Sequence, residues 1–331
     1  MRLQYIDSLK GFLIILVVLG HVIQITNKNF DNDIIFRYIY SFHMPLFFVL
    51  SGFVNFKKEF HFKVLYFRLF QLIIPFFSWW FIKSVVIKNE SFIDSFVILM
   101  KSPDTGLWFL WVLFFCICIF YFLNFIANKL SQRPEIILVF GALFLYIIFL
   151  LSNFRWFGFQ FISWYFMFFI IGFFIHKYEF IINKYNYLIL LVTLILFPVL
   201  AFFSVIKGLP LFYKNIDLGL YFSYIYKFIV ALCGIFLFFN IFKSFFEKHK
   251  YLHIFFCFFK NLGSVTLGIY ATHTLFIEYL FDNQYYSLSY NLQLILFLIF
   301  SLTASYFLIF LIKKIKILKI LLLGEIETKS I

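Results

Sequence analysis

YIDSLKGFLIILVVLGH (residues 5–21) and YSFHMPLFFVLSGFV (residues 40–54) are two apolar runs that lie in segments long enough to cross a lipid bilayer. Both contain polar side chains that lipid disfavours, namely Asp7, Lys10 and His21 in the first run and His43 and Ser51 in the second. Burying an ionisable group in a membrane is costly, so we predict that these groups face a protein-lined cavity and act there.

Helical spacing places the charged groups of the first run on one stripe. His21 follows Lys10 by about three turns, which returns both side chains to one face with roughly 16 Å of rise between them. Asp7 precedes Lys10 by one turn on the same stripe. A cation near one surface and an imidazole deeper inside suit an anionic donor that enters from one side and reacts inside.

The composition independently indicates a membrane protein. Hydrophobic residues make up 64% of the 331 residues and charged residues only 13%, and the mean hydropathy is +0.99. A soluble domain does not carry such a composition on its surface. The four cysteines all lie in apolar runs, so the sequence predicts neither a disulfide framework nor a metal site, and no metal-ligand spacing such as HExxH is present.

The hydropathy pattern predicts an all-α integral membrane protein, a single domain over residues 1–331 built as a polytopic bundle of about ten transmembrane helices. The predicted spans are Leu9–Ile25, Ile34–Phe56, Val64–Ile87, Leu107–Ile126, Ile136–Leu151, Phe159–Ile175, Tyr187–Ile206, Leu218–Phe242, Leu262–Leu280 and Leu292–Ile312.

The distribution of charge predicts the orientation. Most of the 28 basic residues fall in the loops on one side of these spans, which by the positive-inside rule places both termini in the cytoplasm. The net charge of +13 is explained by this topology and by contact with anionic lipid headgroups of the bilayer. A nucleic-acid partner is therefore not needed to explain the charge.

Four segments carry a resemblance to a known family. The lysine followed by histidine in the first span, SFHMPLFFVLSGF (residues 41–53), GLWFLWVLF (residues 106–114) and LGIYATHTLF (residues 267–276) resemble, in the same order, motifs of the acyltransferase-3 family of integral membrane acyltransferases. The opening IDSLKGFLIILVVLGH is most similar to the branch typified by fucose 4-O-acetylase. Lys10 stands where many members have arginine, which keeps the charge but loses a planar fork for bidentate phosphate binding.

The resemblance implies an O-acetyltransferase of the bacterial inner membrane that moves acetyl from cytoplasmic acetyl-CoA to a hydroxyl of a cell-surface or exported carbohydrate. A buried neutral imidazole suits removal of the hydroxyl proton, so His21 is the predicted general base, with Asp7, His43 and His273 as further catalytic candidates. We also predict that His21, His43 and His273 converge at one level of the bundle.

The remaining predicted site residues are assigned to the two substrates. Lys10, Lys63 and Arg68 are predicted to receive the donor's phosphates on the cytoplasmic side, with Lys63 and Arg68 at the start of the third span. Trp108, Trp111 and Ser51 are the predicted acceptor-binding residues. Whether acetyl passes directly or through an acyl-histidine is left open by the sequence.

Each candidate also has a structural interpretation that stays open. Lys10 can be an interfacial anchor, Asp7 a partner of Lys10, and the histidines packing groups. His43 precedes Pro45, so it can serve a carbonyl freed in a kinked helix. Ser51 and Gly52 are typical of close helix packing, and Trp108 and Trp111 of an interfacial aromatic belt.

Two other classes of function remain open at this level. In a polytopic transporter or a flippase of a polysaccharide-assembly system, His21 and Lys10 would be gating or proton-coupling groups. A membrane scaffold without activity of its own is the third class. Paired acidic residues in mid-membrane and repeat symmetry are typical of transporters, and neither is evident here.

Overall fold

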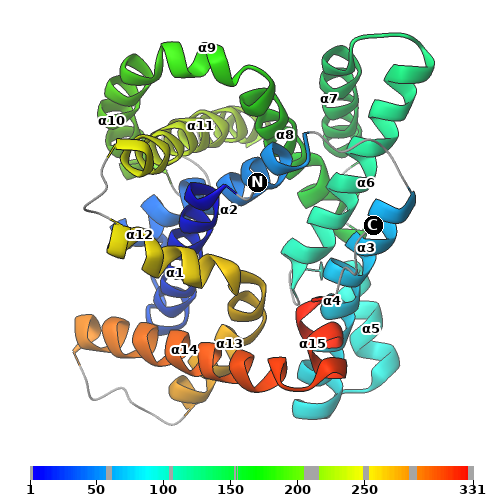
Figure 1. The fold of residues 1–331 in the computed structure, drawn as a ribbon. Coiled ribbons are helices and arrows are strands. Elements are labelled where there is room, and N and C mark those ends of the chain that lie inside the picture. The colour runs from blue at the N-terminus through cyan, green and yellow to red at the C-terminus, as the bar shows by residue number, and fades with distance from the viewer. Residues whose placement is uncertain are drawn as a thin grey trace. The chain divides into compact units, whose positions relative to one another are not determined.

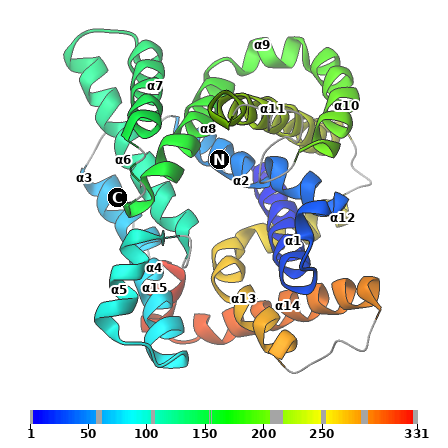
Figure 2. The ribbon, with the colours of Figure 1, turned by 180° about the vertical axis from the view of Figure 1, so that it is seen from behind.

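The structure, a computed structural model, describes residues 3–56, 62–103, 107–152, 154, 156–204, 216–248, 253–282 and 289–326 (Figures 1 and 2). Within these ranges the regular structure is entirely helical. The α-helices are α1 (Gln4–Thr26), α2 (Ile34–Val54), α3 (Phe62–Arg68), α4 (Ile74–Trp80), α5 (Phe92–Lys101), α6 (Trp108–Lys129), α7 (Pro134–Ser152), α8 (Phe159–Lys177), α9 (Glu179–Lys184), α10 (Asn186–Phe202), α11 (Ile216–Lys248), α12 (His253–Ser264), α13 (Thr266–Asp282), α14 (Tyr290–Lys313) and α15 (Lys316–Leu323).

The predicted all-helical membrane fold is confirmed. Eight helical segments of the described chain are long and apolar enough to span a bilayer, and they correspond to eight of the ten predicted spans. The predicted seventh span is the shorter apolar helix α10. These segments make the protein a multi-pass membrane protein.

The predicted ninth span, Leu262–Leu280, is wrong as a single helix. Helix α12 ends at Ser264 and α13 begins at Thr266. At the break the Thr266 hydroxyl donates to the carbonyl of Gly263 at 2.8 Å, and the Ser264 hydroxyl donates to the carbonyl of Asn261 at 2.7 Å. Hydroxyl side chains that bond the local backbone compete with helix continuation, which hydropathy does not detect.

The third span is helical but irregular. Between α3 and α4 lies the π-helical turn Leu69–Ile73, and α4 is followed by a second π-helical segment, Phe81–Ile87. Pro75 lies at the start of α4 and has no N–H to donate to a preceding carbonyl, which favours a widened turn before it. The C-terminal helix α15 packs against this span, where the Trp79 indole N–H donates to the carbonyl of Leu322 at 2.9 Å.

The chain forms two compact units, each built from two stretches of sequence. The first unit comprises Met1–Phe47 and Tyr178–Ile309, and the second comprises Phe48–Lys177 and Phe310–Ile331. Both units therefore combine an early and a late part of the chain.

In the first unit, α1 packs closely along α12, and both views show these helices side by side (Figures 1 and 2). A Cβ atom on Gly11 would lie 1.8 Å from the carbonyl oxygen of Phe259, and one on Gly263 would lie 1.8 Å from the carbonyl oxygen of Asp7. The Ser8 hydroxyl also donates to the carbonyl of Phe256 at 3.1 Å. Backbone meets backbone at this crossing because both helices have glycine there.

The second unit contains an equivalent crossing between the end of α2 and α8. A Cβ atom on Gly52 would lie 1.9 Å from the carbonyl oxygen of Phe169, and one on Gly172 would lie 2.0 Å from that of Val49. The structural interpretation of Gly52, close helix packing by a small residue, is thus what the structure shows.

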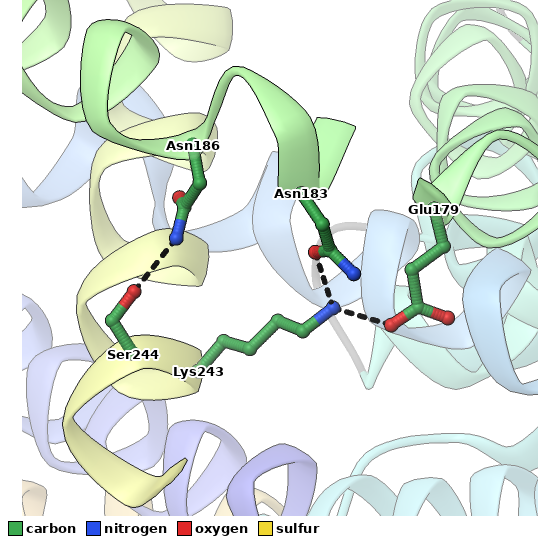
Figure 3. A network of polar contacts seen from close by, with 5 residues as sticks. All are labelled: Glu179, Asn183, Asn186, Lys243 and Ser244. Carbon is green, nitrogen blue, oxygen red and sulfur yellow. Dashed lines mark hydrogen bonds and ion pairs between the residues drawn. The ribbon is translucent and has the colours of Figure 1, made fainter. Parts of the chain in front are cut away.

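Polar contacts tie α9 and α10 to α11 in the first unit (Figure 3). The buried ammonium of Lys243 forms an ion pair with Glu179 and donates to Asn183 Oδ1 at 2.8 Å. One residue further along α11, the Ser244 hydroxyl accepts a hydrogen bond of 2.8 Å from the Asn186 amide. The lysine is therefore compensated locally, as a buried charge must be.

The crossing of α1 and α12 gives a stability prediction. We expect Gly11→Ala to lower the midpoint of thermal unfolding in detergent by at least about 5 °C, because the methyl group would overlap a backbone carbonyl that cannot move independently. Melting of purified protein followed by circular dichroism or tryptophan fluorescence measures it.

The matched control is Gly141→Ala in α7. A Cβ atom there would lie 2.4 Å from the end of the flexible Leu123 side chain, which can rotate away. The control is expected to stay within about 2 °C of the wild type. Equal midpoints for the two variants would show that the crossing is looser than described.

Candidate active site

Helix α1 carries three of the predicted site residues on one uninterrupted helix. It runs from Gln4 to Thr26 without a proline, so the rise per residue places His21 about 16 Å from Lys10 and about 21 Å from Asp7 along its axis. The lysine and the histidine are half-buried, whereas Asp7 is buried. The predicted separation of the basic group and the imidazole along one helix is therefore present.

His21 and His273 lie next to each other. Helix α13 packs against α1, and the centroids of the two imidazole rings are 5.1 Å apart with the ring planes inclined by 46°. His273 is 1% exposed, whereas His21 remains half-buried, so His21 is the more accessible ring of this pair.

His43 completes the cluster from α2. The residue is 3% exposed, and its ring lies 4.8 Å from that of Tyr40, which reaches α1 at Gly20, next to His21. The structure thus brings His21, His43 and His273 together from three helices, as the sequence predicts.

Two of these imidazoles have a defined tautomer when they are neutral. His43 Nδ1 donates to the carbonyl of Ile39 at 2.7 Å, and His273 Nδ1 donates to the carbonyl of Ile269 at 2.9 Å. A carbonyl oxygen only accepts, so the proton of each neutral ring is on Nδ1 and the basic lone pair is on Nε2. The cluster therefore contains imidazoles that present a basic nitrogen away from their own helix.

This geometry also corrects the structural interpretation of His43. Pro45 leaves the carbonyl of Ser41, four residues before it, without its usual N–H partner. His43 donates instead to Ile39, so its role is not to serve the carbonyl that the proline frees.

The sequence interpretation missed two aromatic neighbours of the cluster. The ring of Tyr40 is 4.8 Å from that of His43, and the ring of Tyr270 is 6.0 Å from that of His273. Each tyrosine lies three residues before its histidine and hence on the same helix face, which is the signal that could have identified it.

The buried Asp7 belongs to the crossing of α1 and α12 rather than to the histidine cluster. The backbone of Gly263 approaches its carbonyl, and the length of α1 keeps the carboxylate far from the imidazoles. A catalytic role for Asp7 stays a prediction that no contact in the cluster supports.

The other predicted donor-binding residues lie in the second unit. Lys63 is exposed near the start of α3. The half-buried guanidinium of Arg68 donates to Asn55 Oδ1 at 3.0 Å and to Gln71 Oε1 at 2.9 Å. Both amide partners are neutral, so these hydrogen bonds orient the guanidinium without neutralising it.

The predicted acceptor-binding residues also lie in the second unit and are engaged in packing. The Trp111 indole N–H donates to the carbonyl of Phe157 at 2.8 Å, and its ring contacts Phe76. Trp108 stacks on Phe161, with ring centroids 5.1 Å apart. Ser51 is half-buried, one residue before the glycine of the crossing. Binding of an acceptor by these three residues stays a prediction.

No group of three or more histidine, cysteine, aspartate or glutamate side chains is arranged to hold a metal ion in the part of the chain that the structure describes. The chemistry that the cluster itself offers is proton transfer by imidazole, or nucleophilic attack by it.

The burial of the three rings gives a labelling prediction. We expect diethyl pyrocarbonate to modify His21 at least about tenfold faster than His43 or His273, because a buried ring reacts only after local opening. Peptide mass spectrometry of the native protein, with the denatured protein as control, measures the rates. Equal native rates would contradict the described burial.

Comparisons with known proteins agree with the motifs. A family model described as an acyltransferase domain matches residues 3–312. Nodulation protein NolL of Mesorhizobium japonicum is 35% identical over 121 residues, which cover 33% of this chain and 32% of that protein. Nodulation protein NolL of Sinorhizobium fredii is 41% identical over 80 residues, 22% of each chain.

The chain thus matches about a third or less of the length of these two relatives. No solved structure matches it significantly. Because the family model covers most of the sequence, the chain belongs to the acyltransferase family that this model describes, the acyltransferase-3 family that its motifs resemble.

Proposed function

We propose that the protein is a membrane-bound O-acetyltransferase that moves acetyl from cytoplasmic acetyl-CoA to a hydroxyl of a cell-surface or exported carbohydrate. The observation that carries the proposal is the meeting of three histidines inside a helical unit of a chain from this family. Family membership favours acyl transfer over the transporter and scaffold alternatives.

His21 is the proposed general base. It is the most exposed of the three imidazoles, so an acceptor can reach it. Its ring accepts the proton of the acceptor hydroxyl while the hydroxyl oxygen attacks the acetyl carbonyl, and the proton then passes to the departing sulfur. The ring of His273 contacts this ring, and His43 lies near it on α2.

Lys10 is the proposed phosphate contact of the first unit. When bound, acetyl-CoA supplies an activated acetyl group at the end of a long arm, remote from its phosphates. A half-buried cation about 16 Å along α1 from the base fits a donor with that separation. Lysine binds phosphate as a point charge.

Lys63 and Arg68 remain proposed donor contacts within the second unit. Arg68 suits an anion because its two amide partners hold the guanidinium in place and leave its charge available. The predicted setting is the bacterial inner membrane with both termini in the cytoplasm, so that the donor arrives from inside.

The first test removes the proposed base. We expect His21→Ala to lower the rate of acetyl transfer at least about 100-fold, the usual contribution of general-base catalysis. The measurement is the consumption of acetyl-CoA and the formation of acetylated methyl glycosides by protein purified in detergent.

The control is His176→Phe. His176 lies in α8 of the second unit and stacks on Phe56, which phenylalanine can also do, so wild-type rates are expected. A His21→Ala enzyme within about threefold of the wild type would assign the base to another residue.

The second test concerns the donor. We expect Lys10→Ala to abolish measurable transfer at acetyl-CoA concentrations near the wild-type KM, because the KM for acetyl-CoA rises by about 100-fold or more, and Lys10→Arg to be largely active because the charge remains. Initial rates over a range of acetyl-CoA concentrations measure the change. The exposed Lys129 supplies the control Lys129→Ala, and an unchanged KM in Lys10→Ala would leave Lys10 as an interfacial anchor.

A further inference from the structure

The exposed face of α1 leads away from the histidine cluster through Gln24. Gln24 lies one turn beyond His21, and residues three apart lie on the same side of a helix. Val22 and Ile23 between them are buried, whereas Gln24 is exposed. The glutamine amide is therefore the first strongly polar group along α1 from the half-buried imidazole toward the end at Thr26.

Tyr40 holds this amide in a defined orientation. The Tyr40 hydroxyl donates to Gln24 Oε1 at 3.3 Å. Its ring stacks on Phe36 with centroids 3.9 Å apart and contacts His43 at 4.8 Å. The amide oxygen is thus directed toward Tyr40, and the two N–H groups of the amide point away from it.

The absence of a side chain at Gly20 permits this arrangement. A Cβ atom there would lie 2.7 Å from Cε2 of Tyr40, so glycine lets the phenol ring lie directly on α1 at the residue before His21. One ring consequently contacts both a histidine of the cluster and the amide beside it.

The segment that follows α1 is also held in place. The guanidinium of Arg37 donates to the carbonyl of Asp31 at 2.7 Å and to Asn32 Oδ1 at 3.2 Å, and the Tyr290 hydroxyl donates to Asp33 Oδ2 at 2.7 Å. These bonds tie the connection between α1, which carries Gln24, and α2, which carries Tyr40, to α2 itself and to α14.

We propose that Gln24 and Tyr40 form the acceptor-binding edge of the histidine site. The Gln24 amide N–H donates to an oxygen of the acceptor sugar near the hydroxyl that His21 deprotonates, and Tyr40 positions the amide. Fixing a second oxygen of the same sugar determines which hydroxyl meets the base. This inference rests on the proposed function, and it places acceptor recognition in the first unit instead of at Trp108 and Trp111.

The test measures the KM of each substrate separately, in detergent, with acetyl-CoA and a panel of methyl glycosides of common hexoses and deoxyhexoses. With the best wild-type acceptor, Gln24→Ala is expected to raise the acceptor KM at least about tenfold while the acetyl-CoA KM stays within about twofold. Gln24→Glu keeps the oxygen that Tyr40 binds but has no N–H, so the same loss is expected.

Tyr40→Phe removes only the positioning hydrogen bond, so a smaller rise in the acceptor KM, about threefold, is expected. The matched control is Tyr38→Phe on the same helix, whose hydroxyl donates to the carbonyl of Pro198 at 2.7 Å. This control is expected to leave both KM values unchanged.

The outcomes separate this inference from the function on which it rests. A Gln24→Glu enzyme that behaves as wild type, or a Gln24→Ala enzyme with an unchanged acceptor KM, overturns the inference while acetyl transfer by the wild type supports the function. A rise in both KM values together with a fall in kcat indicates a structural role, and this result also overturns the inference. Wild-type hydrolysis of acetyl-CoA with no glycoside acetylated overturns the sugar-binding role, and no use of acetyl-CoA at all overturns the proposed function as well.

Discussion

The close approach of α1 and α12 is the contact on which the histidine site depends. Gly11 and Gly263 let the two backbones touch, which fixes both the distance between the helices and their register. The chain turns only a few residues later into α13, where His273 follows within about two turns. A larger residue at either glycine would displace α13 against α1, and the contact between His21 and His273 would change with it. The packing of α1 against α12 at Gly11 therefore fixes the position of His273 relative to His21, further along α1.

The cluster also shows how an apolar helical unit accommodates several imidazoles. A buried polar group must be hydrogen-bonded, and His43 and His273 each meet this requirement within their own helix, through the carbonyl one turn earlier. Neither ring depends on another helix for its Nδ1 hydrogen bond, so Nε2 is the nitrogen that is turned away from its own helix. Local satisfaction of one nitrogen is compatible with both packing and catalysis, which is why sequence reasoning alone left the two interpretations of these residues open.

Much of the fold was predictable from the sequence because long apolar runs have few alternatives in a membrane. The break at Val265 was not, because it arises from hydroxyl groups of Ser264 and Thr266 that bond the backbone without changing hydropathy. Convergence of the three histidines followed from comparing their depths, although the sequence could not show that α1, α2 and α13 are neighbours. Gln24 and Tyr40 were missed because neither is ionisable near neutral pH, and only their contacts mark them. Trp108 and Trp111 drew attention as large aromatic residues, yet their rings pack against others of the second unit.

The uninterrupted helix between Lys10 and His21 holds the proposed phosphate contact at a distance from the proposed base. Phosphates are strongly hydrated and favour the water-facing end of a membrane helix, whereas acyl transfer to a weakly acidic hydroxyl benefits from a site that excludes bulk water. Because α1 contains no proline, its length is a fixed distance between the two environments. A flexible cationic side chain at one end tolerates small movements of the donor headgroup, and an imidazole set among buried neighbours at the other does not. In this arrangement positional precision matters most at the histidine end, where the rings of His21 and His273 lie against each other.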